Sequence, residues 1–348
     1  MTNTIYFCTT YYHTLITIIK ALQSKEKFDV ILCKTIPEHE ILKAKLEKTA
    51  LFKSIYYYDT AAFLNERKQS KLKSRLEKLF FVRRRCIATV AEKYLEVDVL
   101  KYDNIYVYMD DHPFAYYLMY HKKKFHLIED ALDFFKYYDK YYHVNKEEYI
   151  PGTIRYLKRK LFGYFVWGYS PFVIDIEVND SDGIRIPEEK VKTVPRKELF
   201  SGLSAEDKLI IYSTYVRGEL SYSETEGKTA VIFTQPLLKD KFVKNKEEQV
   251  KVFESIAHDW FEKGYNLILK PHPRDEAEYD TIVKEYHISY IDKNLPSEIL
   301  NFNPNFHFDV AVTLTTTAIN FLDYADKKIF LGWEYINKVL GKNSEEYE

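Results

Sequence analysis

The chain has 348 residues, 46% hydrophobic and 30% charged, which is a globular composition at a length that predicts two domains. Its formal net charge of -1 at pH 7 gives no bulk attraction to nucleic acid, so we expect no nucleic-acid partner. The three cysteines, Cys8, Cys33 and Cys86, form no CxxC pair, which predicts a reducing compartment and no structural zinc site.

The N-terminal residues 1–22 have no basic segment ahead of their apolar stretch, and threonines and His13 interrupt it. This pattern is typical of a buried strand followed by a helix, not of a signal peptide. No uncharged apolar run reaches the roughly 20 residues that span a bilayer. We therefore expect a cytoplasmic protein.

Strand-like and helix-like segments alternate through the first half of the chain. The expected strands cover residues 4–10, 28–34, 54–59, 104–110 and 124–130. The expected helices cover residues 11–24, 38–50 and 61–95. Strands this apolar are usually covered on both faces, which indicates a parallel sheet with crossover helices.

The second half repeats the alternation. Its expected strands cover residues 173–178, 229–235, 265–272, 287–292, 308–314 and 328–333, and its expected helices cover residues 246–264 and 315–326. Two such series predict an α/β protein with two doubly wound Rossmann-like domains that face a central cleft. We place the domains at residues 1–165 and 166–332, with residues 333–348 as a helix that packs back on the first domain.

Polar residues follow the carboxyl ends of several expected strands, where open α/β sheets bind their ligands. These residues are Thr9, Thr10, Tyr11, Glu129, Asp130, Thr234, Gln235, His272, Glu298, Thr315, Thr316 and Thr317. Their convergence from two domains predicts a binding or catalytic site better than any one motif.

Two acidic pairs follow strands. In Glu129–Asp130, one carboxylate can raise the pKa of the other, which suits a general base, but Asp130 would equally serve as a helix cap. Asp110–Asp111–His112 allows a metal site, yet Pro113 follows directly and favours a capped helix start.

His272 stands between Pro271 and Pro273, which restrict the backbone on both sides. A histidine held this way can donate a proton or a hydrogen bond near neutral pH. Lys270 and Arg274 beside it would attract a phosphate. A satisfied histidine in a tight turn is the alternative, and the position at a strand end favours a functional role.

Thr315, Thr316 and Thr317 open the helix expected at residues 315–326. Backbone N–H groups and hydroxyls at a helix start can bind an anion without a metal, and ordinary N-capping is compatible with that role. The chain has no GxGxxG, no Walker loop and no clustered His/Cys set, so we expect neither a metal nor a cofactor.

Three segments in order, "IEDA" at 128–131, "KPHPRD" at 270–275 and "TLTTTA" at 313–318, resemble the D/E-D/E-G, HP and Ser/Thr motifs of bacterial sialyltransferases. The likeness is closest to glycosyltransferase family 52, which includes lipooligosaccharide and capsular enzymes. "IYFCTTYYH" at 5–13 and "FTQPL" at 233–237 resemble other strands of that family. Ala131 departs from the glycine of the first motif.

The resemblance implies a GT-B fold and an inverting, metal-independent transfer of sialic acid from cytidine monophosphate-sialic acid to a galactose-terminated capsular or lipid-linked glycan. It assigns the base to Glu129 or Asp130, with Asp240 as a less favoured alternative, and the leaving phosphate to His272. It places the acceptor near Thr9, Thr10 and Tyr11. On the nucleotide and phosphate side it implies Lys270, Pro273, Arg274, Glu298, Thr315, Thr316, Thr317 and Gln235.

The basic stretch 71–85 places apolar residues at helical spacing among lysines and arginines. A core-facing helix with a solvated cationic face is favoured, and peripheral contact with the inner face of an anionic membrane is the alternative. Two other functions also stay open: a GT-B transferase for another nucleotide sugar in surface polysaccharide synthesis, or an inactive glycan-binding scaffold subunit. The linkage, the acceptor and the oligomeric state are not encoded in these motifs.

Overall fold

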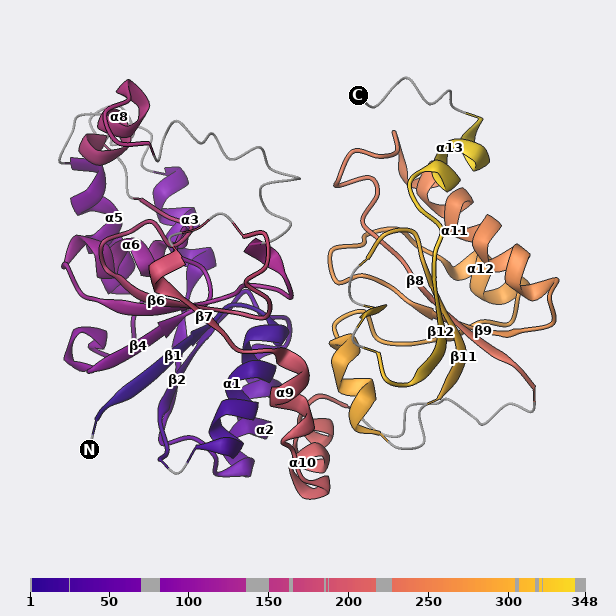
Figure 1. The fold of residues 1–348 in the computed structure, drawn as a ribbon, viewed down its shortest axis with the longest axis horizontal. Coiled ribbons are helices and arrows are strands. Elements are labelled where there is room, and N and C mark those ends of the chain that lie inside the picture. Colours follow the sequence, from indigo (N-terminus) through magenta and orange to yellow (C-terminus); the bar gives the residue numbers. More distant parts are fainter. Residues whose placement is uncertain are drawn as a thin grey trace. The chain divides into compact units, whose positions relative to one another are not determined.

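The computed structural model describes residues 2–24, 26–69, 82–135, 150–162, 165–184, 186, 188–216, 227–303, 307–316, 319–320 and 322–341. The chain divides into two compact units, residues 1–207 and 208–348. Each unit is built on one parallel sheet flanked by helices (Figure 1). The predicted α/β class with two Rossmann-like units is confirmed.

The sheet of the first unit contains, within the described residues, seven strands in the order β3-β2-β1-β4-β5-β6-β7. They are β1 (Thr4–Cys8), β2 (Asp29–Cys33), β3 (Ile55–Tyr58), β4 (Asn104–Val107), β5 (Phe125–Ile128), β6 (Val173–Val178) and β7 (Val191–Thr193). Every pairing is parallel. The order reverses at β1, so the carboxyl ends of β1, β4 and β5 lie together, as in other doubly wound sheets.

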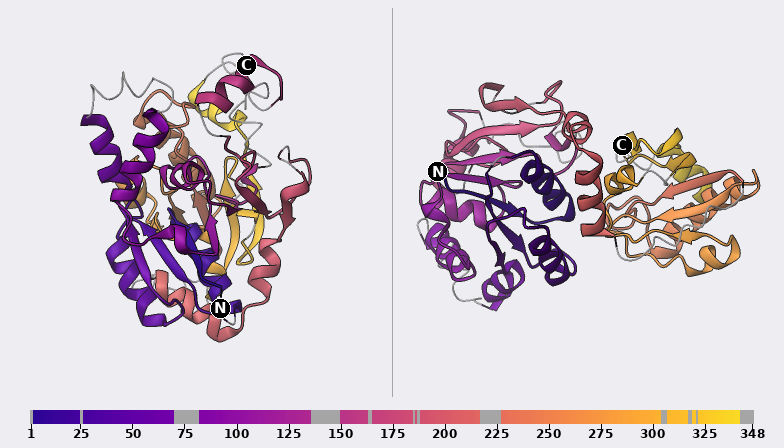
Figure 2. Two further views of the ribbon diagram at one scale, coloured as in Figure 1. Left: turned by 90° about the vertical axis from the view of Figure 1, so that its left-hand side faces the viewer. Right: turned by 90° about the horizontal axis from the view of Figure 1, so that it is seen from below.

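The helices of the first unit cover both faces of this sheet. They are α1 (Tyr11–Gln23), α2 (His39–Thr49), α3 (Thr60–Gln69), α5 (Val82–Lys93), α6 (Pro113–Tyr120), α8 (Ile154–Phe162) and α9 (Arg196–Ser201), with 3-10 turns η1 (Val99–Lys101) and η3 (Glu188–Lys190). A further helix, α10 (Ala205–Tyr215), spans the division at residue 207, and most of it belongs to the second unit. Right-handed crossovers put α1 and α2 on one face and α3, α5 and α6 on the other (Figures 1 and 2). Buried side chains of α3, α5 and α6 share one apolar core with the strands.

The first unit extends further along the chain than the sequence analysis placed it. β6 pairs with β5, with Leu127 opposite Ile176, and β7 pairs with β6. The division therefore falls near residue 207 and not at 165. A strand pattern shows that a segment pairs, but it carries no signal for which sheet the segment joins.

The second unit has a smaller parallel sheet in the order β10-β9-β8-β11-β12. Its strands are β8 (Thr229–Phe233), β9 (Asn266–Lys270), β10 (Ser289–Tyr290), β11 (Phe308–Thr313) and β12 (Ala325–Phe330). Its helices are α11 (Lys246–Phe261), α12 (Asp280–Glu285) and α13 (Glu334–Leu340), with the 3-10 helix η4 (Ser297–Phe302). The carboxyl ends of β8, β9 and β11 are adjacent at the centre of this sheet.

The C-terminal helix α13 contacts α11 inside the second unit. Its Tyr335 hydroxyl donates to Asp259 at 2.8 Å and lies 3.1 Å from the Ser255 hydroxyl. The segment before it is fixed by Trp333, whose ring stacks on Phe242 with centroids 3.9 Å apart. The expected docking of residues 333–348 on the first domain stays a prediction.

Three expected elements differ from the structure. The helix expected at 315–326 is wrong: within the described part of this segment, Ile319 and Asn320 form a short 3-10 turn and β12 already begins at Ala325. β12 therefore begins before the strand expected at 328–333, because parallel pairing with β11 includes Ala325 and the charged residues Asp326, Lys327 and Lys328. The helix expected at 61–95 is observed as α3 and α5, and residues 70–81, which hold most of the basic stretch 71–85, lie outside the described residues.

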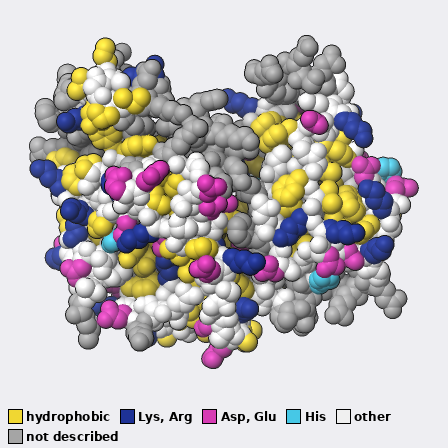
Figure 3. All heavy atoms as spheres, viewed as in Figure 1, with side chains coloured by type: hydrophobic (Ala, Val, Ile, Leu, Met, Phe, Trp, Pro, Cys, Tyr) yellow, Lys and Arg dark blue, Asp and Glu magenta, His cyan; other side chains and the backbone are white. Residues whose placement is uncertain are grey.

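The visible surface mixes acidic and basic side chains, in keeping with the net charge (Figure 3). Exposed apolar side chains gather at α8, where Ile154 is 73% exposed and Leu157 48% exposed. Among the helices that the structure describes, we find no segment with the length and apolarity needed to cross a bilayer.

Candidate functional site

The two carboxylates after β5 have different surroundings. Glu129 is fully buried and accepts the backbone N–H groups of Phe135 at 3.3 Å and Asn179 at 2.8 Å. Burial raises the pKa of Glu129 to about 7, although those N–H groups act in the opposite direction. Glu129 thus ties the loop after β5 to the loop after β6 and is not exposed to a substrate.

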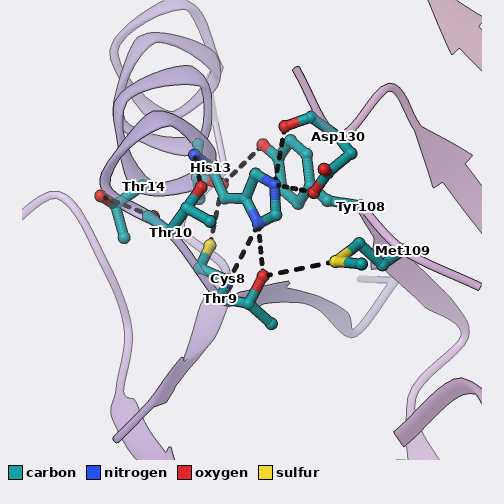
Figure 4. Close-up of polar contacts among 9 residues, drawn as sticks. Cys8, Thr9, Thr10, His13, Thr14, Tyr108, Met109 and Asp130 are labelled. Carbon is teal, nitrogen blue, oxygen red and sulfur yellow. Dashed lines mark hydrogen bonds and ion pairs between the residues drawn. The ribbon is translucent and has the colours of Figure 1, made fainter. Parts of the chain in front are cut away.

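Asp130 keeps part of its carboxylate at the surface, with a side chain 23% exposed. Its Oδ1 lies 2.8 Å from Nε2 of His13, and the same nitrogen lies 2.9 Å from the Asp130 carbonyl oxygen (Figure 4). Of the pair that the sequence left undecided, Asp130 is the member with a solvent-accessible carboxylate.

His13 comes from the first turn of α1, directly after β1, and its side chain is completely buried. Its Nδ1 accepts the backbone N–H of Thr9 at 3.1 Å, and its ring stacks on Tyr108 with centroids 4.2 Å apart (Figure 4). The sequence analysis missed this residue as a site member. The available signal was a histidine five residues after the end of β1, in the first turn of a largely buried helix.

The residues predicted for the acceptor side have local structural contacts. Thr10 caps α1 by accepting the N–H of His13 at 3.1 Å, and the Tyr11 hydroxyl donates to the Pro37 carbonyl at 2.6 Å. Thr9, directly after β1, contacts Nδ1 of His13 through its backbone N–H and its hydroxyl. Their binding of an acceptor stays a prediction.

The segment Asp110–Asp111–His112 forms the capped helix start that its proline favoured. His112 is the N-cap of α6 and accepts the N–H of Phe114 at 3.2 Å, with Pro113 in the first turn. Asp110 is buried and accepts two backbone N–H groups, from Trp167 at 2.7 Å and Gly168 at 2.8 Å.

Asp111 differs from its neighbours. Burial raises its pKa, and the charge of Asp130 raises it further, so the two carboxylates act on one another electrostatically. Its Oδ1 is buried and has no hydrogen-bond partner among the residues that the structure describes. Asp111 is therefore a second acidic group that interacts electrostatically with Asp130, in a segment for which the sequence favoured a helix start over a metal site.

Ala131 occupies the position where the resembling motif has glycine. Its φ is not in the left-handed region; the left-handed residue of this loop is Asp133, with φ 56°. The backbone at 131 therefore does not require glycine here.

In the second unit, His272 follows β9 and is held by two backbone contacts. Its Nδ1 accepts the N–H of Arg274 at 3.0 Å, and its own N–H donates to the Thr234 hydroxyl at 3.1 Å. The proton of the neutral ring must then be on Nε2. Burial lowers the pKa of His272 to about 4, with further lowering by the cations Arg274, Lys270 and Lys239.

Asp275 fixes the loop around His272. It is 2% exposed and accepts hydrogen bonds from the Thr234 hydroxyl, the Tyr279 hydroxyl at 2.8 Å, the Gln249 amide at 2.6 Å and the Ala277 N–H at 2.9 Å. Both carboxylate oxygens are therefore fully used. The sequence did not point to Asp275 and Tyr279, in the loop between β9 and α12, or to Gln249 on α11.

Lys270 is 3% exposed and donates to the carbonyls of Pro271 at 3.2 Å and Lys293 at 3.1 Å. Burial lowers its pKa to about 8, against the opposing charges of Asp292 and Glu298. Its ammonium stabilises the backbone of neighbouring loops in this structure. Contact with a phosphate stays a prediction for Lys270.

Arg274 and Asp240 form one ion pair, with Nη1 3.3 Å from Oδ1 and Nη2 3.4 Å from Oδ2. Both oxygens of Asp240 thus face a guanidinium and are already engaged in this pair. Pro273, between His272 and Arg274, is exposed.

The loops after β8 and β11 are joined by a reciprocal pair. The Gln235 amide donates to the Thr315 hydroxyl at 2.8 Å, and the Thr315 N–H donates back to Gln235 at 3.0 Å. The Thr316 N–H donates to the Thr313 hydroxyl at 3.4 Å, and Thr317 lies outside the described residues. No α-helix begins at Thr315 among the described residues, so an anion site here would use hydroxyls and loop N–H groups.

A pocket of about 480 Å³ opens at the carboxyl ends of β9 and β10. It is lined by Pro271, Asp275, Ala277, Tyr290, Asp292, Lys293 and Asn294. Tyr290 is 51% exposed and offers an aromatic face. Glu298 lies in the first turn of η4, and burial raises its pKa while the charge of Lys270 opposes that shift.

Comparison with known proteins now identifies the family. The model of glycosyltransferase family 52 matches residues 42–331. The chain belongs to glycosyltransferase family 52. It is therefore an enzyme that transfers a sugar, with a nucleotide-sugar donor and a glycan acceptor as its substrates.

This family member is also similar to an uncharacterized protein of Haemophilus influenzae, at 27% identity over 80% of this chain and 81% of that protein. Among solved structures it resembles an alpha/beta-galactoside alpha-2,3-sialyltransferase of Photobacterium phosphoreum, with TM-score 0.52, 11% identity and coverage of 94% and 90% of the two chains. It also resembles the GT-B domain of a sialyltransferase of Photobacterium damselae, with TM-score 0.53, 14% identity and coverage of 98% and 97%. At these identities the likeness shows the fold, which confirms the predicted GT-B class.

Proposed function

We propose that this family 52 enzyme is an inverting sialyltransferase that moves sialic acid from cytidine monophosphate-sialic acid to a galactose-terminated glycan, capsular or lipid-linked, without a metal ion. The observation that carries the proposal is that strand ends present two groups with complementary chemical roles, a proton acceptor in the first unit and a hydrogen-bond donor in the second. Asp130 offers a partly exposed carboxylate to take a proton, and His272 offers an N–H donor to a leaving group. The two sialyltransferases with the same fold support the choice of sugar.

Asp130 takes the proton of the acceptor hydroxyl as that oxygen forms its bond to the anomeric carbon of sialic acid. The bond from this carbon to the phosphate oxygen breaks, and its electron pair leaves with cytidine monophosphate. Attack from the face opposite the leaving group inverts the anomeric configuration. Glu129 keeps the loop behind Asp130 in place and does not exchange the proton.

His272 acts as a hydrogen-bond donor to the departing phosphate and does not need to give up a proton. Its Nδ1 accepts the Arg274 N–H, so a second ring proton would displace that bond. A phosphate monoester has a second pKa of about 6, so cytidine monophosphate leaves as a stable dianion at neutral pH. A donor aimed in advance at a developing charge lowers the barrier without a proton transfer.

The remaining donor contacts would come from the second unit. The Thr315 hydroxyl already accepts from Gln235, so its own hydrogen can donate to the phosphate. The pocket beside Pro271 is large enough for a nucleoside, and the exposed ring of Tyr290 can stack on a base. Glu298 would accept hydrogen bonds from the ribose hydroxyls.

The direct test incubates the protein with cytidine monophosphate-sialic acid and a lactose-type acceptor, in buffer with and without EDTA, and identifies the product by mass spectrometry. We expect transfer that is insensitive to EDTA. A linkage-specific sialidase then defines the bond formed. Stabilisation by uridine diphosphate but not by cytidine monophosphate in a thermal-shift assay would show that the donor is a different nucleotide sugar.

The base is tested by Asp130→Asn, which we expect to lower kcat by 10²–10⁴-fold, about the contribution of a general base. Asp240→Asn is the matched control, because that carboxylate is paired with Arg274, and its kcat should fall far less. A larger loss in the Asp240 variant would reassign the base. Retained glycan binding with no transfer in the wild-type protein would favour the scaffold alternative.

A cytoplasmic location and a contact of stretch 71–85 with the inner face of a membrane remain parts of this proposal. Flotation with anionic liposomes at low and high salt tests the second point. Binding that is unaffected by salt, or absent, would contradict an electrostatic contact.

A further inference from the structure

A fully buried histidine stands directly behind the proposed base. His13 approaches Asp130 through one nitrogen, Nε2, which is 2.8 Å from the carboxylate Oδ1 and 2.9 Å from the carbonyl oxygen of the same residue (Figure 4). Both partners are acceptors. Nε2 must therefore carry a hydrogen to make either contact.

The opposite side of the ring fixes where that hydrogen is. Nδ1 accepts the backbone N–H of Thr9 at 3.1 Å, so its lone pair is in use and it carries no proton. The neutral Nε2–H form is the one that satisfies both nitrogens.

The ring is also held in orientation. Tyr108 stacks on it at 4.2 Å with planes only 8° apart, and Thr10 accepts the N–H of His13 at 3.1 Å, which anchors the first turn of α1. A flipped imidazole would place a C–H against Asp130 and lose both polar contacts. His13 is therefore a rigid donor with one target.

We propose that His13 is a positioning residue for transfer: as a neutral Nε2–H donor it holds Oδ1 of Asp130, and so presents Oδ2 to the acceptor hydroxyl. This inference rests on the proposed role of Asp130 as the base. The acceptor proton ends on Oδ2, because the Nδ1 of His13 is already engaged and no proton passes through the ring.

The same sheet supplies a matched control. His126 on β5 lies 2.8 Å from Asp175 through Nδ1 and stacks on Tyr106 with centroids 4.6 Å apart. This second histidine–aspartate pair has similar packing but is not next to Asp130's carboxylate. Damage that comes only from removing a packed histidine should appear equally at both positions.

The test compares His13→Leu, His13→Gln and His126→Leu with the wild-type protein, using cytidine monophosphate-sialic acid and a lactose-type acceptor. We expect His13→Leu to lower kcat on the order of 10²-fold with the donor KM changed little, since only proton removal is impaired. His13→Gln keeps an N–H near the position of Nε2 and should recover kcat to within about tenfold of the wild type. His126→Leu should leave kcat close to wild type.

The inference is wrong if the glutamine variant is as slow as the leucine variant, or if His126→Leu loses as much kcat as His13→Leu. A second readout does not depend on transfer: nitrogen-15 NMR of labelled histidine should show His13 as the Nε2–H tautomer at pH 7. A protonated ring or the Nδ1–H tautomer overturns the inference. A wild-type protein with that tautomer but no sialic acid transfer would instead reject the proposed function.

Discussion

The hydroxyl of Thr234 connects the backbone of His272 to the carboxylate of Asp275. Replacing Thr234 by valine measures how much these two hydrogen bonds stabilise the second unit. The side chain is 2% exposed. Its hydroxyl accepts the N–H of His272 at 3.1 Å and donates to the carboxylate of Asp275. Thr234→Val keeps the shape of the side chain and removes both hydrogen bonds.

The expected loss follows from these two contacts. A hydrogen bond to a carboxylate contributes about 1.5–3 kcal/mol, and a buried N–H left without a partner costs about 1–3 kcal/mol. Because one hydroxyl makes both, the losses are not independent, and we expect about 3 kcal/mol less free energy of unfolding for the second unit. Thr234→Ser keeps the hydroxyl and loses one methyl group, which costs about 1 kcal/mol.

Urea unfolding followed by tryptophan fluorescence measures this difference, since Trp260 and Trp333 both belong to the second unit. To remove the signal of the first unit, Trp167 is replaced by phenylalanine in every variant. We expect the valine variant to be less stable than the serine variant by about 2 kcal/mol. Equal stability of the two variants, within about 0.5 kcal/mol, would refute the role given to the hydroxyl.

Three further predictions concern charge. For a neutral His272 donor, we expect kcat/KM not to fall tenfold per pH unit between pH 5 and 8. Such a fall is what a requirement for protonated His272 would produce above its pKa of about 4. Arg274→Gln should raise the pKa of His272 measured by NMR titration, but only part of the way to its ordinary value because burial is the larger cause; a lower pKa would contradict this. Arg196 is fully buried with Nη1 2.7 Å from Glu177, so Arg196→Met should lower the free energy of unfolding of the first unit by about 3 kcal/mol. Lys192→Met removes a cation whose side chain is 65% exposed and should lower it by under about 1 kcal/mol in the same chemical unfolding experiment. Similar losses in the two variants would argue against burial as the reason for the difference.

Much of the fold could be predicted because its strands are apolar and end in polar residues. The expected strand 4–10 is observed as Thr4–Cys8, and the expected strand 229–235 as Thr229–Phe233. The same local signal failed at residues 315–326, where helix-like spacing predicted a helix. At the end of that segment, pairing of β12 with β11 takes Ala325 and Asp326 into the sheet and outweighs local preference.

The candidate site was predictable as a set of positions but not as a set of roles. Glu129 and Asp130 are adjacent and chemically alike, and what separates them is the N–H of Asn179 on one and the imidazole of His13 on the other. Those partners lie 50 and 117 residues away along the chain. Only the tertiary structure brings them together, so no local pattern could assign the base.

Lys270 is a case in which the local sequence predicts a role but does not reveal the contacts that the side chain makes. A lysine next to a histidine at a strand end predicts phosphate binding, and nothing in the sequence shows that its ammonium meets the carbonyls of Pro271 and Lys293. Lys270 is only 3% exposed because neighbouring loops cover it, and the local sequence does not encode that burial.

The two histidines of the proposed reaction, His13 and His272, are each fixed by a backbone N–H that donates to Nδ1, from Thr9 and from Arg274. Every residue except proline supplies that N–H. Over evolutionary time, the side chain at position 274 can therefore change without changing which ring nitrogen of His272 carries the proton, provided that it is not proline. Position 9 is more restricted, because the Thr9 hydroxyl also lies 3.0 Å from Nδ1 of His13.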